Sequence, residues 1–200
     1  SENMKKSKII QHSKSMLSRS FNPAKCKTAL KLATSRLKLS RNKKEIQVKQ
    51  MKREIAALLE SGQDRTAMIR VEHVIREEKM VAAYELLEIY CELIVARLPI
   101  IESQKTCPVD LKEAIASVVF ASPRCGDVPE LVDAKKQFTA KYGKDFASAA
   151  NELRPQCGVS RLLVEKLSAV SPDGQTKTKI LTMIAKEHNV EWDPLSPDVE

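Results

Sequence analysis

Apolar residues recur with a helical period through a long part of this chain that lacks helix breakers. Between residues 24 and 98 there is no proline and a single glycine, Gly62. Asn22-Pro23 has the residue types of a helix start, with asparagine as the N-cap and proline at the first helical position. The pattern predicts two long helices, Pro23–Glu60 and Asp64–Leu98, folded into an antiparallel hairpin. Each would be roughly 50–55 Å long at about 1.5 Å per residue.

Two apolar lines run along the first predicted helix. The main line recurs at a spacing of about 3.6 residues and comprises Cys26, Leu30, Ala33, Leu37, Val48, Met51, Ile55 and Leu59. The second line, on roughly the opposite side, comprises Leu32, Leu39 and Ile46. A hairpin needs only one line, so the second is expected to pack on later helices or on a partner. The second predicted helix is apolar almost all round over residues 80–98, which predicts that other helices surround it there.

Prolines and glycines divide the remainder into shorter helices, and no stretch alternates as a strand would. The predicted helices are Pro108–Ala121, Pro129–Tyr142 with a continuation at Lys144–Leu153, Val159–Val170 with Ser160 as its cap, and Gln175–His188. The predicted fold is therefore all-α: a long antiparallel helical hairpin with about four shorter helices packed on it. We expect a basic, flexible extension at 1–20, a helical domain at 21–193 and the start of a polar linker at 194–200.

Composition agrees with a helical protein and limits its chemistry. Charged residues make up 30% of the chain and aromatic residues 4%, a profile typical of helical proteins. There is no apolar run long enough to span a membrane and no apolar segment of a secretory signal near the start. The five cysteines form no C-x-x-C pair, which predicts free thiols in a reducing cytosol.

The positive charge is concentrated at the start of the chain. Residues 1–53 contain 16 Lys or Arg and two acidic residues, a net charge of +14, whereas residues 54–200 contain 18 and 24, a net charge of −6; together they give +8. One basic face of the first helix comprises Lys27, Lys31, Lys38, Lys49 and Arg53, and a second basic line comprises Lys25, Arg36 and Lys43. We interpret the first face as a contact for an anionic membrane or an acidic partner helix. A merely solvated basic face is the alternative.

The segment IRVEHVIREE, residues 69–78, tests whether the chain is an enzyme. His73 and Glu77 share a helix face, but this is at most half of a metal site, and a zinc protease would need a second histidine in place of Glu77. Phosphate-binding glycine loops and nucleophile motifs are absent. We therefore predict no catalytic, cofactor or metal site. The charged residues of this segment, Arg70, Glu72, Arg76 and Glu77, are instead expected to clamp neighbouring helices.

Several blocks of the sequence together resemble the Increased Sodium Tolerance family of ESCRT-III-related proteins. The resemblance covers about residues 17–194, and its first block is plant-like. The blocks are FNPAKCKTALKLATSRLKL (21–39), IRVEHVIREE (69–78), YCELIVAR (90–97), ASPR (121–124), AKYGKDF (140–146), LLVEKLS (162–168) and IAKEHNVEWDP (184–194).

The resemblance implies an ESCRT-III core fold in its closed form and a role without catalysis. Family members regulate endosomal membrane remodelling and protein transport in multivesicular-body formation. They bind charged multivesicular body proteins, especially the type-one member, and they regulate the AAA ATPase that disassembles ESCRT-III filaments and bind its cofactor. Recruitment of the ATPase is expected to need a C-terminal MIT-interacting motif that residues 1–200 lack.

The remaining expectations concern location and alternatives. The resemblance implies a cytoplasmic protein, peripheral on endosomes, with self-assembly or co-polymerisation as a further property. A kink or break is expected at Pro99, where the family fold tends to remain helical. The alternative function is a generic basic module that binds membrane surfaces or nucleic acid. Nucleic acid is not expected as a partner, because the first helix has no aromatic residues for base stacking.

Overall fold

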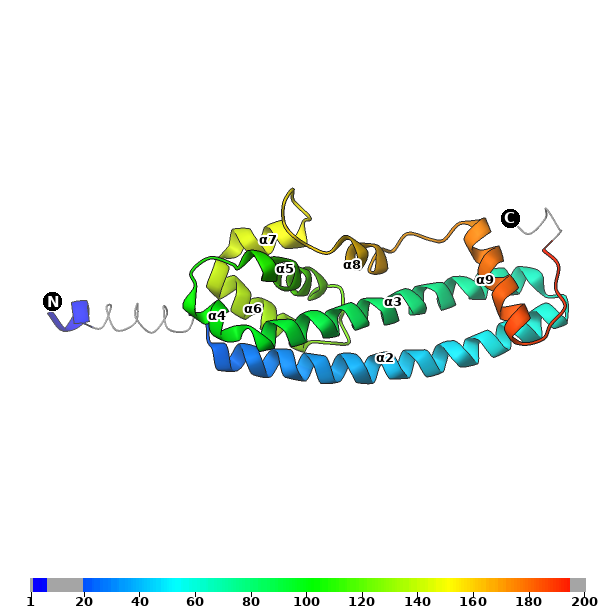
Figure 1. Ribbon diagram of the computed structural model, residues 1–200, viewed down its shortest axis with the longest axis horizontal. Coiled ribbons are helices and arrows are strands. Elements are labelled where there is room, and N and C mark those ends of the chain that lie inside the picture. Colours follow the sequence, from blue (N-terminus) through cyan, green and yellow to red (C-terminus); the bar gives the residue numbers. More distant parts are fainter. Residues whose placement is uncertain (1, 7–19, 195–200) are drawn as a thin grey trace. The chain divides into compact units, whose positions relative to one another are not determined.

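The computed structural model describes residues 2–6 and 20–194, which contain helices and connections but no strand. The hairpin is formed by α2, Pro23–Glu60, and α3, Asp64–Ala96 (Figure 1). Its first helix has the predicted bounds. At its start the Lys25 backbone N–H donates to Asn22 Oδ1 at 3.1 Å, so Asn22 is the N-cap, as predicted.

The turn between the two long helices contains Gly62, the single glycine between residues 24 and 98. Gly62 has φ = 74°, a left-handed conformation that side chains with a Cβ disfavour. Its N–H bonds to the Leu59 carbonyl at 3.2 Å, and the Gln63 N–H bonds to the Leu58 carbonyl at 2.8 Å. These two hydrogen bonds form a Schellman motif, which ends α2.

The chain forms two compact units, and each takes part of both long helices. Unit 1 comprises Ser1–Leu37 and Leu86–Leu163. At its centre is α5, Lys112–Ala121, in which every residue from Ala114 onward is buried. The helices α6, Glu130–Tyr142, and α7, Lys144–Asn151, both contact α5 and each other (Figure 1).

Unit 2 comprises Lys38–Glu85 and Val164–Glu200. Here α9, Gly174–Glu187, packs on α2 and α3. The core of this unit combines residues of all three helices: Val48, Ile55, Ala56, Leu59, Ala67, Val71, Val74, Ile75, Leu181, Ile184 and Ala185. The side chain of Asp173 caps α9 by accepting from the Thr176 N–H at 2.8 Å.

The break expected near Pro99 is confirmed. Helix α3 ends at Ala96, and a separate short helix, α4, runs from Leu98 to Ser103 with the proline in its first turn. A 3₁₀ turn at Val109–Leu111 precedes α5. The shorter elements in the described residues are therefore more numerous than the four expected.

The helix predicted at Val159–Val170 is too long. The observed α8 spans only Arg161–Lys166, and the Leu163 N–H donates to Ser160 Oγ at 3.3 Å, so the predicted cap is present. Beyond α8 the chain turns, and Val170 is 73% exposed. Val170 therefore adds no packing that would extend the helix, and a short helix without packing is marginal in water.

The expectation that other helices surround residues 80–98 is also wrong in part. Ile89 is 61% exposed and Leu93 is 38% exposed, although their neighbours Leu87, Cys91 and Ile94 are fully buried. Of the predicted extension at 1–20, residues 2–6 are helical and residues 7–19 lie outside the described residues. The predicted linker lies outside them too, apart from Pro194.

Candidate partner-binding surfaces

The predicted basic face is exposed on α2. All of its members, Lys27, Lys31, Lys38, Lys49 and Arg53, are exposed, the first two in unit 1 and the other three in unit 2. Within the described residues, no ion pair is formed by Lys27, Lys31, Lys49 or Arg53. Their charge is thus directed to solvent rather than used to hold the fold.

Other basic residues of α2 are neutralised by α3. Lys44 Nζ lies 2.9 Å from Glu77 Oε2, and Lys52 Nζ lies 2.8 Å from Glu78 Oε1. Arg41 makes a longer pair with Glu85 at 3.8 Å. Arg41, Lys44 and Lys52 therefore pair across the hairpin, whereas Lys27, Lys31, Lys49 and Arg53 form no ion pair within the described residues.

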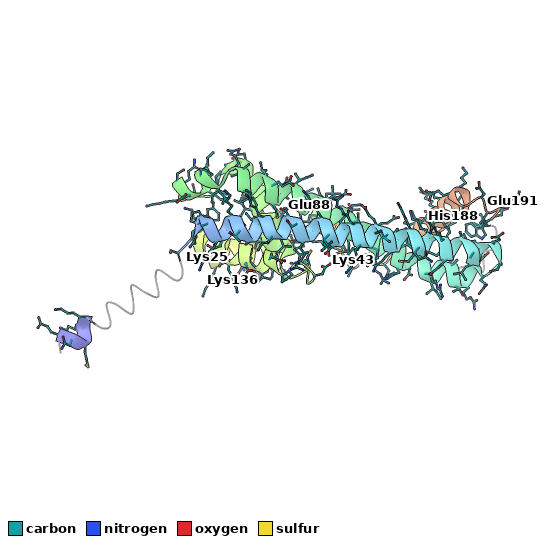
Figure 2. All side chains as sticks on the ribbon, turned by 90° about the horizontal axis from the view of Figure 1, so that it is seen from below. Lys25, Lys43, Glu88, Lys136, His188 and Glu191 are labelled. Atoms are coloured by element: carbon teal, nitrogen blue, oxygen red, sulfur yellow. The ribbon has the colours of Figure 1, made fainter. Side chains whose placement is uncertain are left out.

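The second basic line has three different environments. Arg36 Nε donates to Glu130 of α6 at 2.6 Å. Lys43 is exposed on α2, where Figure 2 labels it. Lys25 lines a groove beside α6.

Three of the four charged residues in the α3 segment 70–77 contact another helix. Glu77 pairs with Lys44 of α2, as described, and Arg70 lies 3.8 Å from Glu54 of α2. Glu72 pairs with Lys177 of α9. The exposed Arg76 acts on Glu72 by its charge. That these contacts stabilise the fold is a prediction, and mutation of the paired residues would test it.

The contact with α9 changes the titration of Glu72. Lys177 donates a hydrogen bond to the carboxylate and adds its positive charge, and together these hold the pKa of Glu72 below its ordinary value. His73 beside it is exposed. Across residues 2–6 and 20–194, no three His, Cys, Asp or Glu side chains come together as metal ligands.

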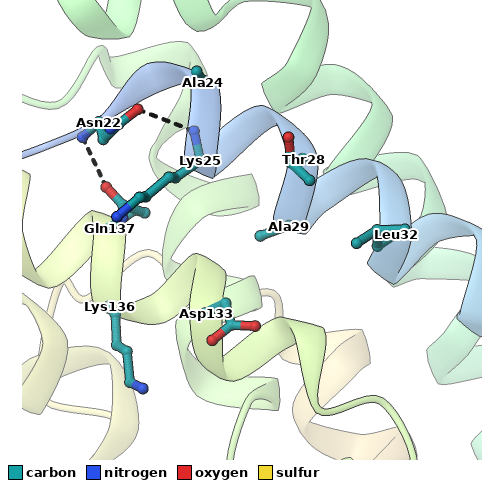
Figure 3. A pocket seen from close by; sticks show the side chains of 9 residues that line it. All are labelled: Asn22, Ala24, Lys25, Thr28, Ala29, Leu32, Asp133, Lys136 and Gln137. Atoms are coloured by element: carbon teal, nitrogen blue, oxygen red, sulfur yellow. Dashed lines mark hydrogen bonds between the residues drawn. The ribbon is translucent and has the colours of Figure 1, made fainter.

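A groove lies in unit 1 between the start of α2 and α6, with a volume of about 540 Å³. Figure 3 shows the Asn22 N–H donating to Gln137 Oε1 across one end, at 2.8 Å. Lys25 and Lys136 lie on opposite walls, with Asp133 on the α6 wall. The α2 wall continues along the helix as far as Leu32. This groove was not predicted from the sequence, because the helices that form it are more than a hundred residues apart in the chain.

The second apolar line of α2 is exposed. Leu32 is 54%, Leu39 65% and Ile46 70% exposed. The line is therefore largely uncovered within the described residues, and its packing on a partner stays a prediction. Since the three residues are seven apart, this line is the kind of seam along which two helices pair.

A second exposed seam was missed. Leu86, Ile89, Leu93 and Ala96 on α3 follow one another at steps of three, four and three residues. This spacing places them on one helix face. Ile89, Leu93 and Ala96 are exposed and Leu86 is partly buried. Their spacing can be read from the sequence, but neighbouring positions are also apolar, so the four residues do not stand out as a separate face.

Two further observations concern membrane-spanning helices and the reactivity of the buried thiols. None of the helices in the described part is both long and apolar enough to cross a membrane. Burial raises the pKa of the Cys26 and Cys91 thiols to about 12, so these cysteines are poor nucleophiles.

Comparison with known proteins gives consistent matches over most of the chain. A family model described as "Ist1: Regulator of Vps4 activity in the MVB pathway" matches residues 27–191. An "IST1-like protein" of Dictyostelium discoideum is 38% identical over 173 residues, 86% of this chain and 46% of that protein. The "Vacuolar protein sorting-associated protein IST1" of Saccharomyces cerevisiae is 28% identical over 179 residues, 86% of this chain and 59% of that protein. This chain thus spans about half the length of the curated relatives it matches.

A solved structure matches the fold. It is the crystal structure of the S. cerevisiae Ist1 N-terminal domain in complex with the Did2 MIM motif, with a TM-score of 0.77 and 28% sequence identity. The match covers 87% of this chain and 96% of that one.

Proposed function

Since this chain belongs to the Ist1 family of regulators of Vps4 activity in the MVB pathway, we propose that it binds the MIM helix of a charged multivesicular body protein. One observation carries this proposal. The relative that holds the Did2 MIM motif is an N-terminal domain, and the match covers 96% of it. The part of the relative that binds the motif is therefore the part that the present chain resembles.

The surface chemistry supports a helix as the ligand. The described residues contain a preformed set of helices with exposed apolar side chains and a groove of about 540 Å³ bounded by two of them. Amphipathic helices bind such surfaces by placing their apolar residues between the host helices. Because the host is already folded, little free energy is lost in ordering the host when the helix binds.

Calorimetry with the C-terminal helix of a type-one charged multivesicular body protein tests the proposal. We expect a one-to-one complex with a dissociation constant in the micromolar range or tighter that persists at high salt, because apolar docking is screened little. A peptide of the same composition in scrambled order is the control. Absence of binding at both low and high salt would remove this function and direct attention to the basic face.

We further propose that the chain has no catalytic activity of its own and acts on the AAA ATPase indirectly. The family description as a regulator of Vps4 supports this role, and Arg70, Glu72 and Glu77 are engaged in contacts between helices. Direct recruitment of the ATPase and its cofactor is expected to need the C-terminal MIT-interacting motif. The test is Vps4 ATPase activity with this chain alone and with the chain plus the MIM-bearing protein; we expect an effect only in the second mixture.

The basic face is proposed as a second contact, with an anionic membrane surface, in keeping with a peripheral protein of endosomes. Its support is that Lys27, Lys31, Lys49 and Arg53 are exposed on one face of α2 and form no ion pair within the described residues. Each basic residue near an anionic surface contributes about 1 kcal/mol. Reversing three of them, Lys27, Lys31 and Lys49, to glutamate should weaken binding by about 100-fold or more, since 1.4 kcal/mol corresponds to a factor of ten.

The assay is sedimentation with vesicles that contain phosphatidylserine, and helicity measured by circular dichroism checks the fold. The matched control reverses Lys105, Lys144 and Lys186, which are exposed elsewhere, so the net charge changes equally. If both triple variants lose binding to the same extent, only net charge matters and the basic face is not a specific contact.

A further inference from the structure

We propose that Ser171, in the connection between α8 and α9, is a phosphorylation site for a proline-directed serine/threonine kinase. The connection comprises residues 168–173, which lie outside the helices (Figure 1). Kinases of this class transfer a phosphoryl group to a serine or threonine that is followed directly by proline. The inference does not rest on binding of a MIM helix, because it concerns a segment that belongs to none of the partner-binding surfaces described above.

The sequence contains three Ser-Pro pairs, and the structure distinguishes between them. The pairs begin at Ser122, Ser171 and Ser196. Ser122 is only 4% exposed, and its backbone N–H donates to the Val118 carbonyl at the end of α5. Ser171 is exposed, whereas Ser196 lies outside the described residues. Of the two pairs in the described part of the chain, the one at Ser171 therefore has the accessible side chain.

The backbone around Ser171 has the form that a kinase cleft requires. A residue before proline is held in an extended conformation, because the proline ring clashes with the helical one, and kinases bind the acceptor segment extended. Ser171 forms no hydrogen bond with the other described residues. Its neighbour Val170 is 73% exposed. The segment can therefore enter a cleft without breaking a hydrogen bond of Ser171 or uncovering an apolar core.

Ser168 lies in the same connection and differs from Ser171 in two respects. It is followed by Ala169 rather than by proline. Its hydroxyl oxygen accepts a hydrogen bond from the Val170 N–H at 3.3 Å, and its own N–H donates to the Glu165 carbonyl at 3.2 Å. Ser168 is thus held in a turn, and it provides an internal control for the effect of position in the connection.

The reaction joins the hydroxyl oxygen of Ser171 to the γ-phosphorus of ATP. A new O–P bond forms while the bond from the γ-phosphorus to the β,γ-bridging oxygen breaks, the hydroxyl proton passes to the catalytic aspartate of the kinase, and ADP leaves. The product carries a charge of about −1.5 to −2 at pH 7. Residues 54–200 have a net charge of −6, so phosphorylation makes this part of the chain more acidic still.

The start of α9 is able to accommodate the added charge. Hydrogen bonds from Thr176, together with the charge of Lys179, hold the pKa of the capping Asp173 below its ordinary value. This end of the helix therefore favours negative charge. Repulsion between the phosphate and Asp173, two residues later, acts in the opposite direction. We therefore expect phosphorylation to change the surface of the connection and to leave α9 attached to α2 and α3.

Incubation of the complete, folded 200-residue chain with a kinase of the mitogen-activated class, ATP and Mg²⁺ tests the assignment. Mass spectrometry of the digested product locates the phosphate, which we expect on Ser171 and not on Ser122 or Ser168. The variant Pro172→Ala should lose phosphorylation at Ser171, because the hydroxyl remains but the proline that directs the kinase is gone. The matched control, Ser168→Ala, changes the same connection and should be phosphorylated at Ser171 like wild type.

Hydrogen exchange of the α9 amides in the phosphorylated chain measures the effect on the fold. Exchange should change by less than about fivefold, since a charge near a helix end has a small effect on stability. The proposal is overturned if Ser171 carries no phosphate, if Pro172→Ala is phosphorylated there as fast as wild type, or if Ser122 is phosphorylated as fast as Ser171. Exchange of the α9 amides at the rate of an unfolded chain would contradict the expectation that the start of α9 accommodates the phosphate.

Discussion

The attachment of α9 to unit 2 makes a quantitative prediction. Leu181 of α9 is fully buried in the core that α9 shares with α2 and α3. Replacing it with alanine removes apolar contacts and leaves a cavity, which costs about 2–5 kcal/mol for a buried leucine. With a central value of about 3 kcal/mol, detachment of α9 should become about 100-fold more frequent, since 1.4 kcal/mol is a factor of ten.

Hydrogen exchange of the α9 amides measures that detachment directly. The matched control is Met183→Ala, two residues away on the same helix, whose side chain is 55% exposed. A surface substitution of this kind changes stability by no more than about 0.5 kcal/mol, so exchange should rise less than about threefold. If Leu181→Ala and Met183→Ala accelerate α9 exchange equally, the buried core is not what holds α9, and the reasoning is wrong.

Two further predictions concern titration and thiol reactivity. The lowered pKa of Glu72 means that its carboxylate stabilises the folded state above its ordinary pKa of 4.5, and that this stabilisation is lost as pH falls through the lower folded pKa. Trp192 packs on the core that α9 shares with α2 and α3, so its fluorescence can follow unfolding during an acid titration. The stability of the folded state should fall less steeply with decreasing pH in Glu72→Gln than in wild type. An unchanged titration curve would show that the ion pair does not couple α9 to the fold. A thiol reagent at pH 8 should modify the partly exposed Cys157 in the native protein and reach Cys26 and Cys91 only on unfolding, measured by mass spectrometry of the labelled peptides; rapid labelling of all three would contradict their burial.

Local signals explain why much of the hairpin could be predicted from the sequence. The bounds of α2 follow from Asn22-Pro23 and from Gly62, whose positive φ few other residues adopt. The break after Ala96 follows from Pro99, which cannot continue a helix without losing a hydrogen bond. These signals act within a few residues, so sequence alone reveals them.

Features that depend on contacts between distant segments were less predictable. The helix predicted at 159–170 ends at Lys166, and Val170 beyond it is 73% exposed. The exposure of Ile89 and Leu93 could not be derived from the sequence, because an apolar run does not show which of its faces are covered by other helices. The groove beside α6 requires Asn22 and Gln137 to meet, and no local pattern encodes that meeting.

The most direct test of the account is a titration of the isotopically labelled chain with the MIM helix of a type-one charged multivesicular body protein, followed by nuclear magnetic resonance. The account predicts saturable shifts in one contiguous surface of the helices, with the resonances of the buried cores unchanged, because a preformed surface receives the helix. Shifts that are absent at millimolar peptide, or that spread through both cores as the helices unfold, would contradict it.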